Sequence, residues 1–112
     1  MERPTARKKE TQAVEAPAGI TRTTIAYNDD LMLCHFHLKK GVTIPFHRHP
    51  SAQNGYLIKG KLLMKWESGK QFLAEPGDGW CFDSNESHGV EVIEESEIVE
   101  CFAPSRADYI PK

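Results

Sequence analysis

From Ile20 onward, apolar side chains recur at short intervals that match β-strands rather than helices. Apolar stretches at 23–27, 31–38 and 42–46 are separated by turns rich in Asn, Asp, Lys and Gly. No window of helical length carries an apolar period of about 3.6 residues. The pattern therefore predicts an all-β fold from Ile20 to the C-terminus.

The second half of the chain continues this pattern with tighter turns. Residues 55–58 and 61–67 flank the dipeptide Lys59-Gly60, and this arrangement predicts a hairpin. We expect further separate strands at 71–75, 80–82, 88–93 and 97–103. Many short strands separated by such turns indicate a sandwich or a barrel. The interior of a small barrel has room for one metal ion or small ligand.

The N-terminal segment differs from the rest. It is polar, carries the basic patch Arg7-Lys8-Lys9 and ends in the turn Pro17-Ala18-Gly19. We expect residues 1–19 to be a flexible tail, or an arm that orders on a partner subunit, and residues 20–112 to form the barrel domain.

Composition narrows the class of protein. A chain of 112 residues is one domain, and its net charge of -2 argues against a nucleic-acid partner. No apolar run approaches the ~20 residues of a membrane span, so no membrane partner is expected. Cys34, Cys81 and Cys101 are odd in number and widely spaced. We therefore expect free, packed thiols and a cytoplasmic location.

A histidine cluster is the first candidate for chemistry. His47 and His49 are two residues apart, so an extended chain places both rings on one face. Gln53 follows four residues later, and His88 lies on a later strand. Three imidazoles and one amide oxygen suit a divalent Zn, Ni, Fe or Mn ion. The alternative is a pair of surface histidines on a loop.

A second histidine pair, His35 and His37, alternates along the stretch 31–38. The apolar residues of that stretch face the other way, so we place this pair on the outer or interface side of the barrel. The alternative is a contact with the substrate or with a metal ligand.

The last strand carries a buried-acid signal. Ile98, Glu100 and Phe102 share one face, and a carboxylate between two apolar residues is costly unless it is paired or used. Arg106 follows shortly and can fold back over the barrel mouth to hold a carboxylate. The alternative is a solvated glutamate face with Arg106 in a loose tail.

The spacing of these residues resembles the two cupin motifs. The first motif is matched by Gly41, His47, His49, Gln53 and Gly60, with Gln53 where Glu is usual. The second is matched by Gly77 and His88, with Asp83, Asn85 and Val92 at positions that usually carry Pro, Gly and Asn. The chain is identified on this resemblance as a cupin, a small jelly-roll barrel also called a double-stranded β-helix.

The stretches 31–33, 47–56 and 100–109 resemble the small monocupins of pectin and alginate breakdown, and the resemblance runs from about Leu31 to Tyr109. That resemblance implies a metal site completed by Gln53 and conversion of 4,5-unsaturated uronates to linear 5-keto-4-deoxyuronates. It also implies that Glu100, Phe102 and Arg106 are needed for activity, with Glu100 where Asp is usual.

Two other functions stay open for a cupin with this sequence. One is an Fe(II) dioxygenase, although a neutral Gln ligand favours polarising a substrate oxygen over oxygen chemistry. The other is a non-enzymatic module that binds a sugar or another small molecule. In each case we expect a homodimer, because a small core benefits from pairing.

Overall fold

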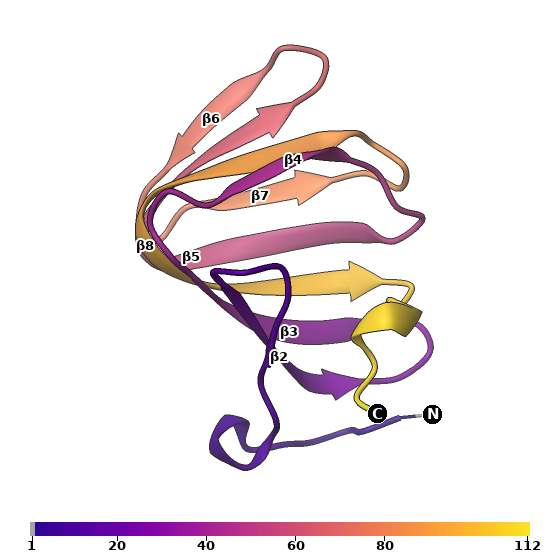
Figure 1. Cartoon of the computed structure of the whole chain (residues 1–112). Coiled ribbons are helices and arrows are strands. Elements are labelled where there is room, and N and C mark those ends of the chain that lie inside the picture. The colour runs from indigo at the N-terminus through magenta and orange to yellow at the C-terminus, as the bar shows by residue number, and fades with distance from the viewer. Residues whose placement is uncertain (1) are drawn as a thin grey trace.

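The computed structural model describes residues 2–112, which form one antiparallel sheet curled around a single core (Figure 1). The strand order is β1-β2-β3-β8-β5-β6, with β4 added on β8 and β7 added on β5. The strands are β1 (Val14–Glu15), β2 (Ile20–Tyr27), β3 (Met32–Leu38), β4 (Thr43–His47), β5 (Ala52–Trp66), β6 (Gln71–Ala74), β7 (Gly79–Phe82) and β8 (His88–Ala103). Two short 3-10 turns, η1 (Lys8–Glu10) and η2 (Ala107–Tyr109), complete the structure. The predicted all-β fold is confirmed.

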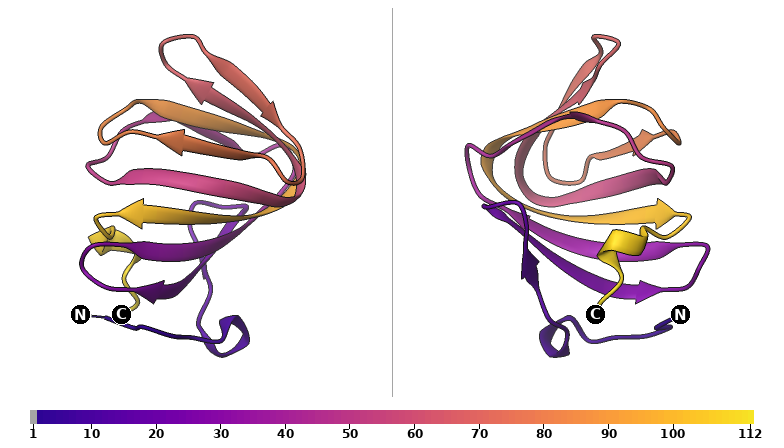
Figure 2. Two further views of the ribbon diagram at one scale, coloured as in Figure 1. Left: turned by 180° about the vertical axis from the view of Figure 1, so that it is seen from behind. Right: turned by 45° about the vertical axis from the view of Figure 1, so that its right-hand side comes forward.

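Two long strands replace the predicted hairpin. The reversal expected at Lys59-Gly60 is wrong, because β5 runs through it for 15 residues. The stretches 88–93 and 97–103 are likewise one strand, β8, of 16 residues. The two strands pair from end to end, with register shifts between Leu57 and Leu62. The paired strands bend together near residues 57–62 of β5, and this bend, called the corner below, curls the sheet around the core (Figure 2).

Gly60 explains why the corner forms. Its φ is 109°, and a Cβ there would lie 2.2 Å from Oγ of Ser96 on β8. The Ser96 hydroxyl in turn accepts a hydrogen bond from the Lys61 amide at 3.1 Å. Only glycine satisfies both the backbone angle and this close approach.

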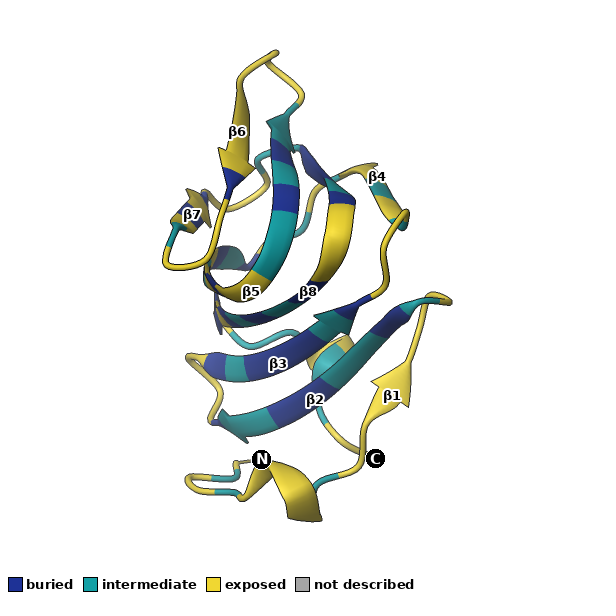
Figure 3. Ribbon diagram, turned by 90° about the vertical axis from the view of Figure 1, so that its left-hand side faces the viewer, coloured by how far each residue is buried: buried dark blue, intermediate teal, exposed yellow. Residues whose placement is uncertain are grey.

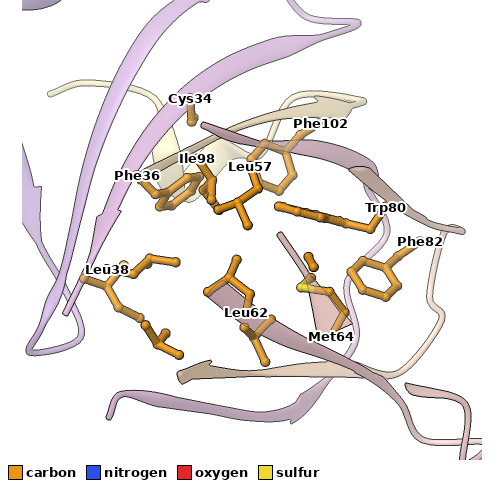
Figure 4. Packing of buried hydrophobic residues seen from close by; sticks show 14 of the residues in the cluster. Cys34, Phe36, Leu38, Leu57, Leu62, Met64, Trp80, Phe82, Ile98 and Phe102 are labelled. Carbon is orange, nitrogen blue, oxygen red and sulfur yellow. The ribbon is translucent and has the colours of Figure 1, made fainter. Parts of the chain in front are cut away.

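Buried residues alternate with more exposed ones along the second half of β8, while every residue of β2 and β3 is buried or half-buried (Figure 3). On β3, Phe36 and Leu38 join the core that Figure 4 shows, whereas His35 and His37 belong to the alternate set. The two histidines pair with Glu97 and Glu95, each at 2.8 Å. Neither histidine lines the cavity described below. His37 is partly exposed, as its predicted outer position requires, whereas His35 is buried on that side of the sheet.

The cysteines only partly follow expectation. Cys34 is buried, but Cys81 and Cys101 are exposed, so the prediction that all three pack inside is wrong for these two. All three thiols are free. Within residues 2–112, no helix has the length and hydropathy needed to cross a membrane.

The N-terminal segment lies along the open edge of the sheet. β1 pairs with β2, and the Gly19 carbonyl accepts a hydrogen bond from the Lys39 amide at 2.9 Å. β2 starts at Ile20, the predicted start of the barrel domain. Flexibility of the predicted tail, residues 1–19, stays a prediction, and Met1 lies outside the described residues.

The corner gives a stability prediction. Replacing Gly60 by Ala combines backbone strain of about 1–3 kcal/mol with overpacking against Ser96 of about 1–3 kcal/mol. Gly69 is the matched control, since its φ is 111° but a Cβ there has no neighbour within 4 Å. Gly60→Ala should therefore lower the free energy of unfolding by about 2 kcal/mol more than Gly69→Ala. Urea unfolding measures both, and equal losses would contradict the packing role of Gly60.

Candidate functional site

Three imidazole rings converge at one end of the barrel. His47 ends β4, His88 begins β8 directly opposite it, and His49 lies in the loop that leads to β5. One nitrogen from each ring lies within 4.8 Å of the other two. These three residues can therefore hold a single metal ion, as the His-x-His spacing predicted.

Backbone carbonyls orient the three rings. Nδ1 of His47 donates to the carbonyl of Pro45 at 3.0 Å, and Nδ1 of His49 to that of Ser51 at 2.7 Å. Nδ1 of His88 donates to the carbonyl of Glu86 at 2.7 Å. A carbonyl only accepts, so each neutral ring carries its proton on Nδ1. The lone pair on each Nε2 is then free for a metal ion.

Two of these ring nitrogens are buried and have no hydrogen-bond partner within residues 2–112, which suits a metal ligand. Among the described residues, the buried side-chain nitrogen and oxygen atoms without a hydrogen bond are Nε2 of His49 and Nε2 of His88. Burial lowers the pKa of His88 to about 4, and burial followed by the charge of Arg106 lowers that of His49. Both rings thus stay neutral near pH 7, the form that binds a divalent cation.

Gln53 links the histidines to the acid. It lies near the start of β5, is buried, and its Nε2 donates to Oε2 of Glu100 at 2.8 Å. The Gln53 side chain also interacts with His49 and raises the pKa of that ring, which offsets part of the effect of burial. With Nε2 engaged, the amide oxygen is the atom left for an ion, which fits the predicted fourth ligand.

Glu100 is buried in the β8 face that the alternation predicted. Its neighbours Ile98 and Phe102 on that face are 5% and 1% exposed, and Glu100 itself is 8% exposed. Burial raises the pKa of Glu100 to about 7, against the opposing effect of two hydrogen bonds and Arg106. A carboxyl group of this kind can both give and take a proton near neutrality.

Arg106 lies at the mouth of the site, at the start of η2. Its guanidinium pairs with Asp108 at 2.9 Å and lies 4.0 Å from the ring centroid of Tyr109. The guanidinium is also 5.7 Å from the centroid of Phe102, which contacts His49 edge-on. Arg106 therefore folds back over the barrel, as predicted, but the carboxylate that it holds is that of Asp108 rather than that of Glu100.

One cavity of about 140 Å³ reaches part of this site, although His49 and His88 are not among the residues that line it. It is lined by His47, Gln53, Glu100, Phe102 and Arg106, and also by Pro17 of the N-terminal segment. Pockets for drug-sized ligands measure about 300–1,000 Å³, so this one suits a smaller molecule. The β4–β5 loop and η2 lie at the same end of the barrel (Figures 1 and 2).

Sequence reasoning missed some members of the site. Trp80 on β7 donates its indole N–H to Oε2 of Glu100 at 2.8 Å. Asp108 and Tyr109, which hold Arg106, belong to the stretch 100–109 that resembles the pectin and alginate cupins, but their contacts with Arg106 were not predicted. The histidines are oriented by backbone carbonyls, and residue type does not predict which carbonyl a ring will contact. Trp80 was placed on a strand, but its partner depends on strand register, which local pattern does not reveal.

Comparisons with known proteins agree with this geometry. The sequence profile described as cupin domain matches residues 34–103. The pectin degradation protein KdgF of Dickeya dadantii is 36% identical over 103 residues, which cover 90% of this chain and 93% of that protein.

Solved structures match the fold over nearly the whole chain. KdgF from a Halomonas species superposes with a TM-score of 0.87 at 26% identity, covering 95% of this chain and 99% of that one. An RmlC-like cupin from Shewanella frigidimarina superposes with a TM-score of 0.90 at 20% identity, covering 96% of both. The chain thus belongs to the cupin family, and it is homologous to the pectin degradation protein KdgF.

Proposed function

We propose that this protein is a metal-dependent enzyme that converts a 4,5-unsaturated uronate into the linear 5-keto-4-deoxyuronate. The observation that carries the proposal is the cavity lined by Glu100, Gln53 and His47, where the buried acid is hydrogen-bonded to Gln53. His47 in turn converges with His49 and His88. The homology to a pectin degradation protein supports a small acidic sugar as the substrate.

The proposed reaction is an isomerisation, so its atoms balance without a co-reactant. The anomeric hydroxyl loses a proton, the bond between C1 and the ring oxygen breaks, and C1 becomes an aldehyde. The resulting enolate at C5 becomes a ketone when C4 takes up a proton. The enzyme must therefore hold the sugar, move protons and favour developing negative charge on oxygen.

The site residues divide these tasks. A divalent ion held by His47, His49, His88 and the amide oxygen of Gln53 would supply Lewis-acid polarisation of a substrate oxygen. Glu100 moves the proton, because its raised pKa lets both protonation states exist near neutrality.

The remaining residues of the cavity hold the sugar. Arg106 provides the positive charge that attracts the substrate carboxylate, and the buried ring of Phe102 forms the wall beside it. The small cavity restricts the substrate to a single sugar unit rather than a polymer. A homodimer and a cytoplasmic location remain part of the proposal, and they stay predictions.

Metal binding is the first requirement of this function. His49→Ala removes one of three ring ligands and should weaken Ni²⁺ binding at least about 100-fold. His37→Ala is the matched control, because His37 pairs with Glu95 away from the cavity and should leave affinity unchanged. Isothermal titration of metal-free protein with Ni²⁺ measures both. Equal affinity of the two variants would refute the predicted ligand set.

Substrate conversion is the direct test of the reaction. Metal-loaded protein should speed the loss of ultraviolet absorbance of 4,5-unsaturated galacturonate, since the reaction removes the C4–C5 double bond. Protein stripped of metal should return the rate to the spontaneous one. No oxygen uptake should accompany the reaction, measured with an oxygen electrode. A rate equal to the spontaneous one with metal-loaded protein would reject the proposed activity.

Proton transfer by Glu100 predicts a specific loss. Glu100→Gln keeps the shape of the side chain but removes its acid–base function, and should lower kcat by about 10²- to 10⁴-fold. Glu95→Gln changes an exposed glutamate paired with His37 and should leave kcat within about twofold. If both variants keep the wild-type kcat while binding Ni²⁺ normally, Glu100 is not the proton-transfer group.

A further inference from the structure

Strand register places Trp80, Gly55 and Glu100 in one row across three strands. Gly55 on β5 is the register partner of Trp80 on β7. The same Gly55 is the register partner of Glu100 on β8. Neighbouring strands are about 4.8 Å apart, so Trp80 and Glu100 are separated by a whole strand. A side chain that joins them must cross above Gly55.

The absence of a side chain at Gly55 makes this crossing possible. A Cβ on Gly55 would lie 2.5 Å from three atoms of the Trp80 indole, Nε1 among them. The ring therefore lies directly over the glycine backbone, and any larger residue would displace it. Trp80 is 6% exposed and belongs to the buried core (Figure 4).

The indole N–H and the Gln53 amide reach the same oxygen of Glu100. Nε1 of Trp80 and Nε2 of Gln53 each donate to Oε2 at 2.8 Å. A carboxyl oxygen has two lone-pair sites, so two donors occupy Oε2 fully. When Glu100 is protonated, its proton must then reside on the other oxygen, Oε1.

Oε1 is the oxygen that remains open to the cavity. Over residues 2–112, Oε1 makes no side-chain hydrogen bond. The fully buried side-chain atoms without a hydrogen bond are Nε2 of His49 and Nε2 of His88, so Oε1 is not fully buried. Because Glu100 lines the cavity, the accessible oxygen faces the space where a substrate binds.

We propose that Trp80 is a positioning residue which, together with Gln53, holds Oε2 of Glu100 so that Oε1 carries and exchanges the proton with the substrate. This inference rests on the proposed function and deepens it, because it names the reacting oxygen and the residue that selects it. Gly55 has the supporting role of leaving the path open for the indole.

Kinetics of one conservative variant test the proposal. Trp80→Phe keeps an aromatic ring over Gly55 but removes the N–H donor. It should lower kcat on 4,5-unsaturated galacturonate by about 10- to 100-fold, as expected for losing one hydrogen bond to an ionisable group. KM and Ni²⁺ affinity should stay within about twofold, since Trp80 is neither a proposed metal ligand nor one of the residues proposed to hold the sugar.

Trp66→Phe is the matched control, because Trp66 is the other tryptophan of the chain and contacts Lys70 and Phe82 instead. It should keep kcat within about twofold. An unchanged kcat in Trp80→Phe, or an equal loss in the control, overturns the positioning role.

A spectroscopic readout keeps the inference testable if the proposed activity fails or if Trp80→Phe does not fold. The two indole N–H groups give two ¹H–¹⁵N resonances, which Trp66→Phe assigns. In the metal-free protein, Glu100→Ala removes the acceptor and should shift the Trp80 indole proton upfield while that of Trp66 stays in place. No shift of the Trp80 resonance would show that the hydrogen bond is absent and would overturn the inference, whatever the wild-type activity.

Discussion

The hydrogen bonds from three imidazoles to backbone carbonyls are the constraint on which this structure depends. Each carbonyl lies two residues from its histidine, so the local chain path at Pro45, Ser51 and Glu86 sets the direction of each ring. Because Nδ1 is engaged in all three rings, the Nε2 lone pairs point into common space. The barrel brings these three chain segments together through the pairing of β4 with β8 and the start of β5.

A buried carboxyl group gives this site its second defining property. Desolvation of Glu100 is unfavourable, and the indole of Trp80 and the amide of Gln53 offset part of that cost. Both donors bond Oε2, so one oxygen of the group is satisfied, and we assign the proton exchange to the other. The acid is thus held on the scaffold by strands rather than by a loop, which favours precise placement.

The pair of histidines 47 and 49 and the buried acid could be predicted from local spacing, whereas Gln53 and His88 follow mainly from the longer spacing of the cupin motifs. The two-residue spacing of His47 and His49 keeps their rings close, although His49 lies in the loop after β4. Alternation along β8 puts Glu100 on the same face as Ile98 and Phe102. Gly60 shows the limit of such reasoning. A glycine with positive φ suits a hairpin and a strand corner equally well, and only the distant Ser96 shows which one forms.

Trp80 shows the same limit at the site itself. Its hydrogen bond to Glu100 depends on the register of three strands and on a missing side chain between them. The exposure of Cys81 and Cys101 likewise follows from which strand face turns outward, not from the nature of cysteine.

A crystal of the purified protein, with anomalous diffraction collected at the absorption edge of the metal found by elemental analysis, tests the central claim most directly. The account predicts one anomalous peak per chain, within bonding distance of Nε2 of His47, His49 and His88 and of the amide oxygen of Gln53. An ion bound elsewhere, or the three rings turned away from one another around an empty space in protein supplied with metal, would contradict it.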